Sequence, residues 1–284
     1  MSDLARPEIR RAELAGTWYP GEPGACRAAI DRHRAGATPG SERALIGPHA
    51  GWTYSGTCAG LGYASLDPAT RSAELAIVFG SHRGPAGPDT VFTAEGWDTP
   101  LGVLETDREL AARAAEELGI VSEPVAPQRA DNAVEVHLPF VRHAFPRARL
   151  LMLGVAAAPH ARAIGAAVGA LAKDRDAVVI GSTDLTHYGP NYGWAPHGGG
   201  EPAVRWVREV NDAGFVSRVT SDDPDAALRH AIDEQSACCP GAVIAAMEAA
   251  RVLSGAIAPR LIDHRLSTDV RPSESFVGYA SIVM

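Results

Sequence analysis

Apolar residues recur along this chain in two forms, short continuous runs and longer stretches of helix-forming residues. The continuous runs predict buried strands, at residues 44–47, 75–80, 150–155, 177–181 and 276–283. The longer stretches predict helices, at residues 55–66, 107–118, 159–172, 202–213, 224–234 and 240–253. Strands that alternate with helices are joined by crossover connections, which make neighbouring strands parallel. The pattern therefore predicts an α/β fold with a central, largely parallel sheet flanked by helices.

The helix at residues 107–118 has the clearest end signals. Asp107 is expected to cap its amino end, and Gly119 is expected to be its C-terminal stop. Residues 81–100 are expected to be rich in loops. No proline- or serine-rich linker, repeat or low-complexity tract divides the 284 residues. The whole chain, residues 1–284, is therefore expected to form one domain.

Composition narrows the class of protein. The hydrophobic content of 46% is enough for a substantial core, and the formal charge is −8. A nucleic-acid-binding protein needs clustered positive charge, so a small-molecule substrate is the expected partner instead. No apolar run reaches the roughly 18 residues of a membrane span, and the amino end lacks the apolar core of a signal peptide. We expect a cytoplasmic protein with no membrane partner, and a homo-oligomer stays open.

Histidines follow three of the predicted strands directly. His49 and His82 each lie in a glycine-bounded turn after a strand, and Asp184 and His187 follow the strand at residues 177–181. In an open α/β sheet, ligands bind beyond the carboxyl ends of the strands, so these side chains are expected on the rim of an active site. Neutral imidazole suits zinc, copper and iron alike. The three turns therefore predict a shared metal or catalytic centre.

Two adjacent cysteines, Cys238 and Cys239, precede the predicted helix at residues 240–253. The N–H groups and the dipole at a helix amino end lower the pKa of a thiol, which makes its sulfur a metal ligand or a nucleophile. Alternatively, both side chains are small buried apolar groups. Adjacent residues usually cannot both face one site, so Cys238 is the stronger candidate. Together with Cys26 and Cys58 they do not form a disulfide framework in a chain this long.

Several blocks, taken in order, resemble the Memo family, whose bacterial members are also called AmmeMemoRadiSam system protein B. The blocks are AGTWYP at 15–20, PHAGWTYSG at 48–56, GSH at 80–82, EVHLPF at 135–140, STDLTHYG at 182–189, and Cys238. The resemblance covers nearly the whole chain and implies a fold similar to the class III extradiol dioxygenases. It also implies a metal site of His49, His82 and Cys238, and an acid/base histidine at His187 with Asp184 beside it.

The chain departs from the family pattern at two places. Asp131-Asn132-Ala133 stands where an acid, a histidine and a serine are expected, which bears on the substrate pocket. Cys239 stands where a glycine is common, so that it either perturbs the metal loop or offers a competing thiolate.

These observations lead to one main hypothesis, a mononuclear metal-dependent oxidoreductase that acts on a small aromatic or other oxidisable substrate with dioxygen (O2). Fe(II) is the expected cofactor, because three protein ligands on one face leave open positions for substrate and O2. A thiolate is softer than the carboxylate of the extradiol enzymes and also suits copper or zinc. The resemblance in fold therefore does not by itself imply ring cleavage.

Four further residues are candidates for the substrate pocket. Trp18, Trp52 and Tyr54 offer flat apolar surface for an aromatic ring, or else belong to the core. His137 alternates with apolar residues, which suits a structural residue on a half-buried segment as well as a pocket residue.

Two other functions stay open. The first is a copper- or iron-binding or peptide-docking protein that uses the same cleft without turnover. The second is a zinc hydrolase in which His187 or Asp184 activates water.

Overall fold

Four parallel strands form the centre of the main sheet, in the order β2–β9–β3–β8. The computed structural model describes residues 8–124 and 131–284. The central strands are the apolar runs of the sequence: β2 (Ala44–Gly47), β3 (Leu75–Gly80), β8 (Arg149–Gly154) and β9 (Ala177–Ser182). Gly47 pairs with Ser182, and Phe79 pairs with Gly181, so β2, β9 and β3 end level with one another. The turns that follow these three strands therefore leave the sheet at one edge.

Antiparallel strands extend the sheet on both sides. β12 pairs with β2 and also with β10 and β11, while β4 pairs with β8 and then with β7. The bounds of these outer strands are β4 (Thr90–Phe92), β7 (Val121–Glu123), β10 (His187–Tyr188), β11 (Arg260–Leu266) and β12 (Phe276–Val283). A separate small sheet contains β1 (Ile9–Arg10), β5 (Gly96–Trp97) and β6 (Leu104–Glu105).

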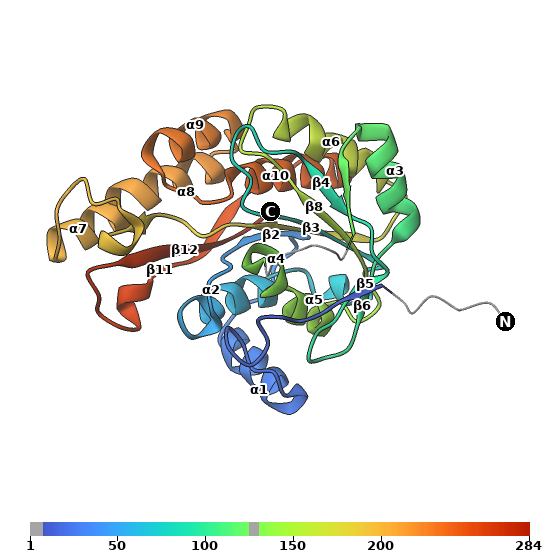
Figure 1. Cartoon of the computed structure of the whole chain (residues 1–284), viewed down its shortest axis with the longest axis horizontal. Helices are drawn as coiled ribbons and strands as arrows, with labels where there is room; N and C mark the ends of the chain where they lie inside the picture. Colours follow the sequence, from blue (N-terminus) through green and yellow to red (C-terminus); the bar gives the residue numbers. More distant parts are fainter. Residues whose placement is uncertain (1–7, 125–130) are drawn as a thin grey trace.

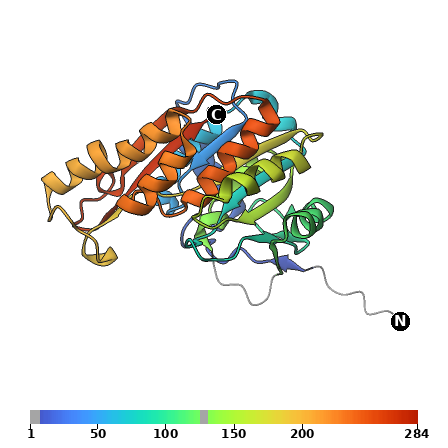
Figure 2. The same cartoon turned by 90° about the horizontal axis from the view of Figure 1, so that it is seen from above.

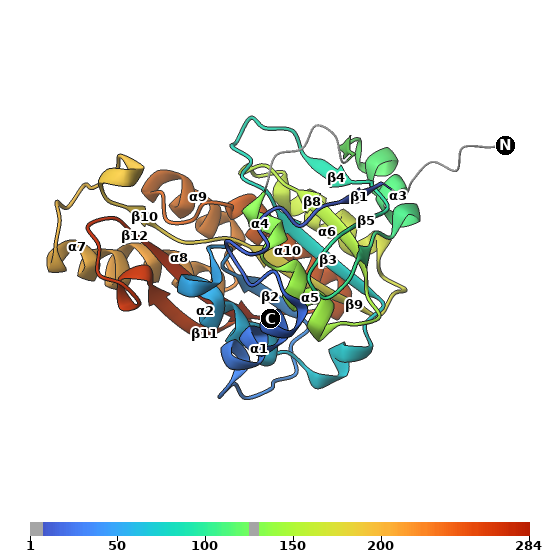
Figure 3. The same ribbon diagram turned by 60° about the horizontal axis from the view of Figure 1, so that its bottom comes forward.

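Helices cover both faces of the main sheet (Figures 1 and 2). One layer contains α3 (Arg108–Leu118), α6 (Ala161–Leu171), α8 (Ala213–Thr220), α9 (Pro224–Glu234) and α10 (Pro240–Ser254). The other contains α1 (Pro23–Arg34), α2 (Trp52–Ala64), α4 (Asn132–Glu135) and α5 (Leu138–Ala144). Figure 3 shows α7 (Glu201–Trp206) at the far end of the molecule from α3. Within residues 8–124 and 131–284, no helix combines the length and apolarity needed to cross a membrane.

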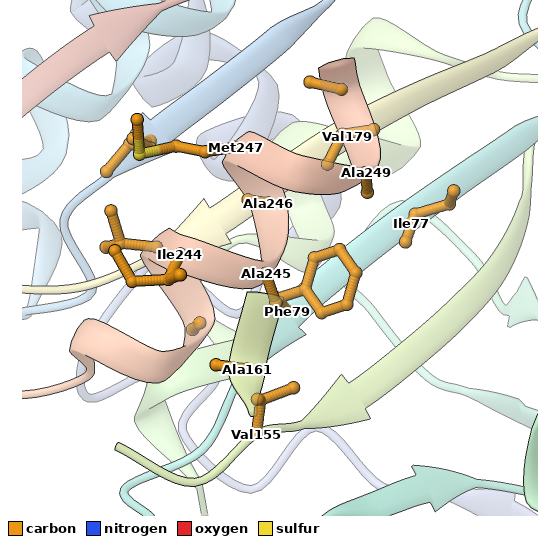
Figure 4. Packing of buried hydrophobic residues seen from close by; sticks show 14 of the residues in the cluster. Ile77, Phe79, Val155, Ala161, Val179, Ile244, Ala245, Ala246, Met247 and Ala249 are labelled. Carbon is orange, nitrogen blue, oxygen red and sulfur yellow. The ribbon is translucent and has the colours of Figure 1, made fainter. Parts of the chain in front are cut away.

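Helix α10 packs tightly between the sheet and α6. Its residues Ile244 to Ala249 lie over Ile77, Phe79 and Val179 of the central strands (Figure 4). Gly165 and Gly169 of α6 face the α10 backbone at Ala245 and Ala249, where a Cβ atom would collide. Close backbone approach of this kind fixes the position of α10. The amino end of α10, which follows the two cysteines, is thereby held against the sheet.

The structure confirms the predicted α/β class and most of the predicted elements. Asp107 caps α3 by accepting a hydrogen bond from the N–H of Leu110, and Gly119 ends the helix with a φ of 63°. Helix α2 begins at Trp52, three residues before the predicted start at 55. Helix α1 and strand β11 had no counterpart in the sequence prediction.

One predicted helix ends too early. The helix predicted at residues 202–213 continues as a helical run to Thr220, through a π-helical turn at Val207–Asp212. Gly214 lies inside this run, and a Cβ atom there would lie 2.5 Å from Nε2 of His230, so the glycine serves helix packing.

The segment around His137, expected to be half-buried, is fully buried. Residues 133–141 are all buried and belong to α4, α5 and the turn between them.

Candidate metal centre

The turn after β2 buries His49 and holds it by hydrogen bonds to both its backbone and its ring. The side chain is 1% exposed. The backbone N–H groups of His49 and Ala50 both donate to Oδ1 of Asp184, at 2.7 and 3.2 Å. The ring atom Nδ1 lies 2.8 Å from Oγ of Ser182, at the end of β9. Partners of this kind orient a metal-binding imidazole and leave its other nitrogen, Nε2, for the metal.

The turn after β3 presents His82 differently. Ser81 precedes it with a φ of 77°, a left-handed conformation that few residues other than glycine adopt and that concentrates at functional sites. The His82 side chain is 46% exposed, and its Nδ1 lies 3.8 Å from Oδ1 of Asp131. Its ring centroid is 4.9 Å from that of His49. The two predicted histidine ligands therefore lie side by side.

Both cysteines face this pair of histidines. Sγ of Cys238 lies 3.2 Å from Nε2 of His49 and accepts the N–H of Asp184 at 3.3 Å. Sγ of Cys239 lies 3.7 Å from Sγ of Cys238. The loop is fixed behind them, because Gly241 contacts the backbone of Ala156 so closely that it leaves no room for a Cβ atom. The sequence did not predict that two adjacent side chains would reach one site.

The donor atoms of the four residues His49, His82, Cys238 and Cys239 all lie within 4.8 Å of one another. Imidazole nitrogens and sulfurs at such distances are the donors that zinc, copper and iron take in proteins. The residues present therefore fit a single transition-metal ion.

The charges in the cluster suit metal binding. Burial opposes ionisation of Cys238, but the hydrogen bond from the Cys239 thiol and the nearby His49 hold the pKa of Cys238 well below its ordinary value. The Asp131 carboxylate and the Cys238 sulfur raise the pKa of His82 to about 10. Without a metal, the site therefore favours a thiolate next to an imidazolium. Metal binding must displace the imidazolium proton, as is usual for histidine ligands.

Asp184 and His187, the predicted catalytic pair, have different surroundings. Asp184 is buried, and its Oδ1 accepts the two N–H groups of the His49 turn, so its carboxylate holds the backbone of that turn. His187 begins β10 and is partly exposed. Its Nδ1 lies 3.1 Å from the carbonyl oxygen of Leu185, and its ring meets that of Tyr192 edge-on, with the centroids 4.9 Å apart.

An aromatic pocket of about 640 Å³ adjoins the His49 turn. Trp18 and Tyr54, two of the predicted pocket residues, lie on its wall together with Tyr192. Ala50 and Gly51, which follow His49, form part of the same wall. The remaining lining residues are Thr17, Thr53, Asn191, Ser267, Arg271, Pro272, Ser273, Ser275, Val277 and Tyr279.

The other two predicted pocket residues lie in the core. Trp52 is 3% exposed, packs at a tilt against Phe140 with the ring centroids 4.4 Å apart, and donates its indole N–H to the carbonyl oxygen of Val136. His137 is 1% exposed, its Nδ1 lies 3.1 Å from the Tyr63 hydroxyl, and burial lowers its pKa to about 3. Both side chains support the site from behind and do not line the pocket.

Sequence reasoning missed several residues that complete the site. Ser182 and Tyr192 were not singled out, although Ser182 directly follows a predicted strand and Tyr192 follows the His187 block by a few residues. Asp131 was noted only as part of a departure from the family pattern, and here it is the carboxylate nearest to His82. Its neighbour Asn132 donates to the carbonyl oxygen of His49 at 3.2 Å.

Fold and donor set together define an α/β protein with a candidate transition-metal centre at the carboxyl edge of its sheet. A sequence profile described as Memo-like protein matches residues 10–283, and the chain belongs to the Memo family.

Curated relatives agree with this assignment over nearly their full length. A MEMO1 family protein of Methanothermobacter thermautotrophicus is 32% identical, over 96% of this chain and 99% of the relative. One from Thermococcus onnurineus is 29% identical, over 97% of this chain and 99% of the relative. Among solved structures, an uncharacterized protein from Escherichia coli K12 has a similar fold. Its TM-score is 0.50 at 15% identity, over 84% of this chain and 98% of that chain.

Proposed function

We propose that this chain is a mononuclear metal-dependent oxidoreductase that oxidises a small aromatic or other oxidisable substrate with dioxygen, with Fe(II) as its first choice of metal. The observation that carries the proposal is the cluster of His49, His82 and Cys238 donor atoms, together with an aromatic pocket whose wall includes Ala50, the residue after His49. The resemblance of the Memo family to the class III extradiol dioxygenases supports it. The four free cysteines fit action in a reducing compartment such as the cytoplasm.

Each donor has a supporting partner in the fold. Ser182 orients the His49 ring, Asp184 holds the backbone of the His49 turn, and Asp131 lies next to His82. An iron ion held by His49, His82 and Cys238 would supply open positions for substrate and dioxygen and a route for electrons between them. The protein's own contribution is to bring the three donors close together at one edge of the sheet.

His187 is the proposed base. The Leu185 carbonyl oxygen can only accept a hydrogen bond, so Nδ1 of His187 carries the proton that it donates there. In the neutral ring, Nε2 is then unprotonated and can take a proton from a substrate hydroxyl. The edge-on contact of His187 with Tyr192, a residue of the pocket wall, supports this role.

The pocket wall supports an aromatic substrate with an anionic group. Trp18, Tyr54 and Tyr192 offer ring faces and edges against which an aromatic compound can pack. Arg271 is the charged residue of the wall, and it forms no ion pair within residues 8–124 and 131–284. A carboxylate or phenolate on the substrate would find a cation there.

Oxygen uptake tests this proposal directly. Protein reconstituted anaerobically with Fe(II) is exposed to a panel of catechols and aminophenols, with and without an added carboxylate. We expect uptake that depends on the substrate and is lost in His49→Ala and His187→Ala. His160→Ala, which changes a histidine outside the site, is the matched control and keeps the wild-type rate. Stoichiometric iron with no uptake from any compound would refute the oxidoreductase.

A second candidate function is a metal-holding protein without turnover. The observation that favours it is the second sulfur, because metal sites with four protein donors are usually structural and leave no position for a substrate. Tight metal binding with no response to any compound of the panel would support this function over the first.

A further inference from the structure

Cys239 faces the donor cluster although its neighbour Cys238 already does so. Cys239 is the N-cap of α10 and has non-helical backbone angles, with φ −130° and ψ 56°, so the chain bends at this residue. The bend brings both sulfurs to the same side, 3.7 Å apart. Within the part of the chain that the structure describes, the Cys239 thiol has no hydrogen-bond partner other than Cys238.

The spacing of the sulfurs matches that of two ligands on one tetrahedral ion. Bonds of about 2.3 Å from a zinc ion to each sulfur, at the tetrahedral angle, separate the sulfurs by about 3.8 Å. The observed separation is 3.7 Å. A sulfur and an imidazole nitrogen on the same ion would lie about 3.5 Å apart, and Sγ of Cys238 and Nε2 of His49 are separated by 3.2 Å. The two sulfurs therefore need little movement to share an ion.

The other two cysteines show what a purely structural thiol looks like in this protein. Cys26 is buried among the apolar residues of the core beneath α1. Cys58 of α2 is fully buried, and its thiol lies 3.6 Å from the Ser281 hydroxyl. Within residues 8–124 and 131–284, neither joins a cluster of metal-donor side chains. Cys239 is equally buried and also packs in the apolar core, but its sulfur lies within 4.8 Å of the donor atoms of His49, His82 and Cys238.

We propose that Cys239 is a fourth metal donor, so that this chain holds its ion in a tetrahedral shell of two imidazole nitrogens and two sulfurs. The inference rests on the proposed metal site, and it favours the second candidate function, a metal-holding protein, over the oxidoreductase. Three protein donors leave a fourth position for water or substrate, whereas four donors close a tetrahedral shell. Two thiolates also shift the preference of the site from iron toward zinc and Cu(I). In this chain, Cys239 then controls whether a substrate reaches the ion.

Cobalt substitution tests the donor count without any assay of turnover. Co(II) bound by thiolates absorbs through sulfur-to-metal charge transfer, and the intensity grows with each coordinating sulfur. We expect Cys239→Ala to bind Co(II) with about half of the wild-type charge-transfer intensity, and Cys238→Ala to show the same loss. Cys26→Ala, which removes a core thiol of similar burial, is the matched control and keeps the full intensity. Unchanged intensity in Cys239→Ala would overturn the proposal.

Zinc binding provides two further measurements. In competition with a chelator, Cys239→Ala should bind zinc roughly 100-fold more weakly or worse, in line with the loss of one donor from a four-donor site. In the unaltered protein, zinc should protect both Cys238 and Cys239 from alkylation, as located by mass spectrometry. This second measurement needs no variant, so it remains decisive if Cys239→Ala folds poorly. Protection of Cys238 alone would overturn the proposal.

The outcomes separate this inference from the proposed function. If the unaltered protein binds neither Co(II) nor zinc, the metal site itself fails, and the oxidoreductase and the fourth donor fall together. If metal binds and the Cys239 measurements are unaffected, only the fourth donor is refuted. If Cys239 proves to be a donor, we also expect Cys239→Gly, which restores the residue common in the family, to increase any substrate-dependent oxygen uptake.

Discussion

The turns after β2 and β3 carry equivalent histidines but hold them in opposite ways. His49 is 1% exposed, and its backbone and ring are both tied to β9 and to the segment that follows it. The His82 side chain is 46% exposed and has a single carboxylate nearby, after a strained Ser81. The first turn is therefore built before a metal binds, whereas the second has room to adjust.

This difference suggests a division of labour within one site. A preorganised donor contributes more to affinity because little entropy is lost when the metal binds, whereas a mobile donor loses side-chain freedom of about 1 kcal/mol. A mobile donor can in return adapt to a ligand that enters the shell. The following predictions test whether the two turns really differ in this way.

The largest contrast is expected in metal affinity. Structural zinc sites bind with about 10–16 kcal/mol, so each of four donors contributes about 2.5–4 kcal/mol. His49→Ala should therefore weaken zinc binding roughly a hundredfold to a thousandfold. His82→Ala should cost about fivefold less, because ordering the exposed ring offsets about 1 kcal/mol of its contribution. Competition with a chelator measures both. Equal losses in the two variants would remove the distinction between the turns.

The next effect concerns the stability of the metal-free protein. Asp184→Ala leaves the N–H groups of His49 and Ala50 buried without an acceptor, and each unsatisfied group costs about 1–3 kcal/mol. We expect a loss of about 3 kcal/mol in the free energy of unfolding, measured with urea. Asp131→Ala, at the second turn, serves as the matched control and should cost far less. A cost below about 1 kcal/mol for Asp184→Ala would show that the first turn is not held by this carboxylate.

The contrast between the turns also explains which parts of the site the sequence could predict. His49 and His82 were found because each directly follows an apolar run, and the carboxyl ends of parallel strands meet at one edge. Cys238 was found from its place before a helix and from the resemblance. Nothing in the spacing distinguishes a buried histidine from an exposed one. That difference depends on Ser182, Asp184 and Asn132, which long-range packing brings to the first turn.

The elements of the fold show the same difference between local signals and long-range packing. Long apolar runs and well-capped helices such as α3 were predicted, because their signals are local. Strand β11, with several charged residues, was missed because its pairing with β12 stabilises it, and no periodic pattern marks it. The alternation of Val134, Val136 and Leu138 fits a strand and a helix equally well over so few residues. Cys239 was underestimated because the bend at the N-cap of α10 has no sequence signature.

Low pH should destabilise the folded protein through His137, which packs behind the first turn. His137 lies behind Gly47, where a Cβ atom would be 3.3 Å from its ring, and burial lowers its pKa to about 3. Its pKa in the unfolded chain is near 6.5, so below that pH the unfolded state gains a proton that the folded state excludes, and stability falls as the pH falls toward 3. At pH 5 the loss amounts to about 2 kcal/mol.

Urea unfolding at pH 7 and pH 5 measures this effect. His137→Asn should lose about 2 kcal/mol less between the two pH values than the unaltered protein does. His160→Asn replaces a half-exposed histidine elsewhere and should leave the difference unchanged. If His137→Asn keeps the full acid sensitivity, then His137 is not held neutral behind the first turn.

The smallest effect concerns the second turn. Here stability is lost as the pH rises, the opposite direction to the effect of His137. Asp131 and Cys238 raise the pKa of His82 to about 10, so the stabilisation from the imidazolium is complete below pH 6.5 and is lost as the pH rises toward 10. Because the His82 side chain is 46% exposed, solvent screens the pair, and Asp131→Asn should cost no more than about 0.5 kcal/mol at pH 6. Its effect should shrink further at pH 9, in urea unfolding of the metal-free protein. Asp31→Asn, which removes an exposed carboxylate beside His143, sets the scale for a pair outside the site. A cost for Asp131→Asn that matches that of Asp184→Ala would mean that both turns are built before the metal binds.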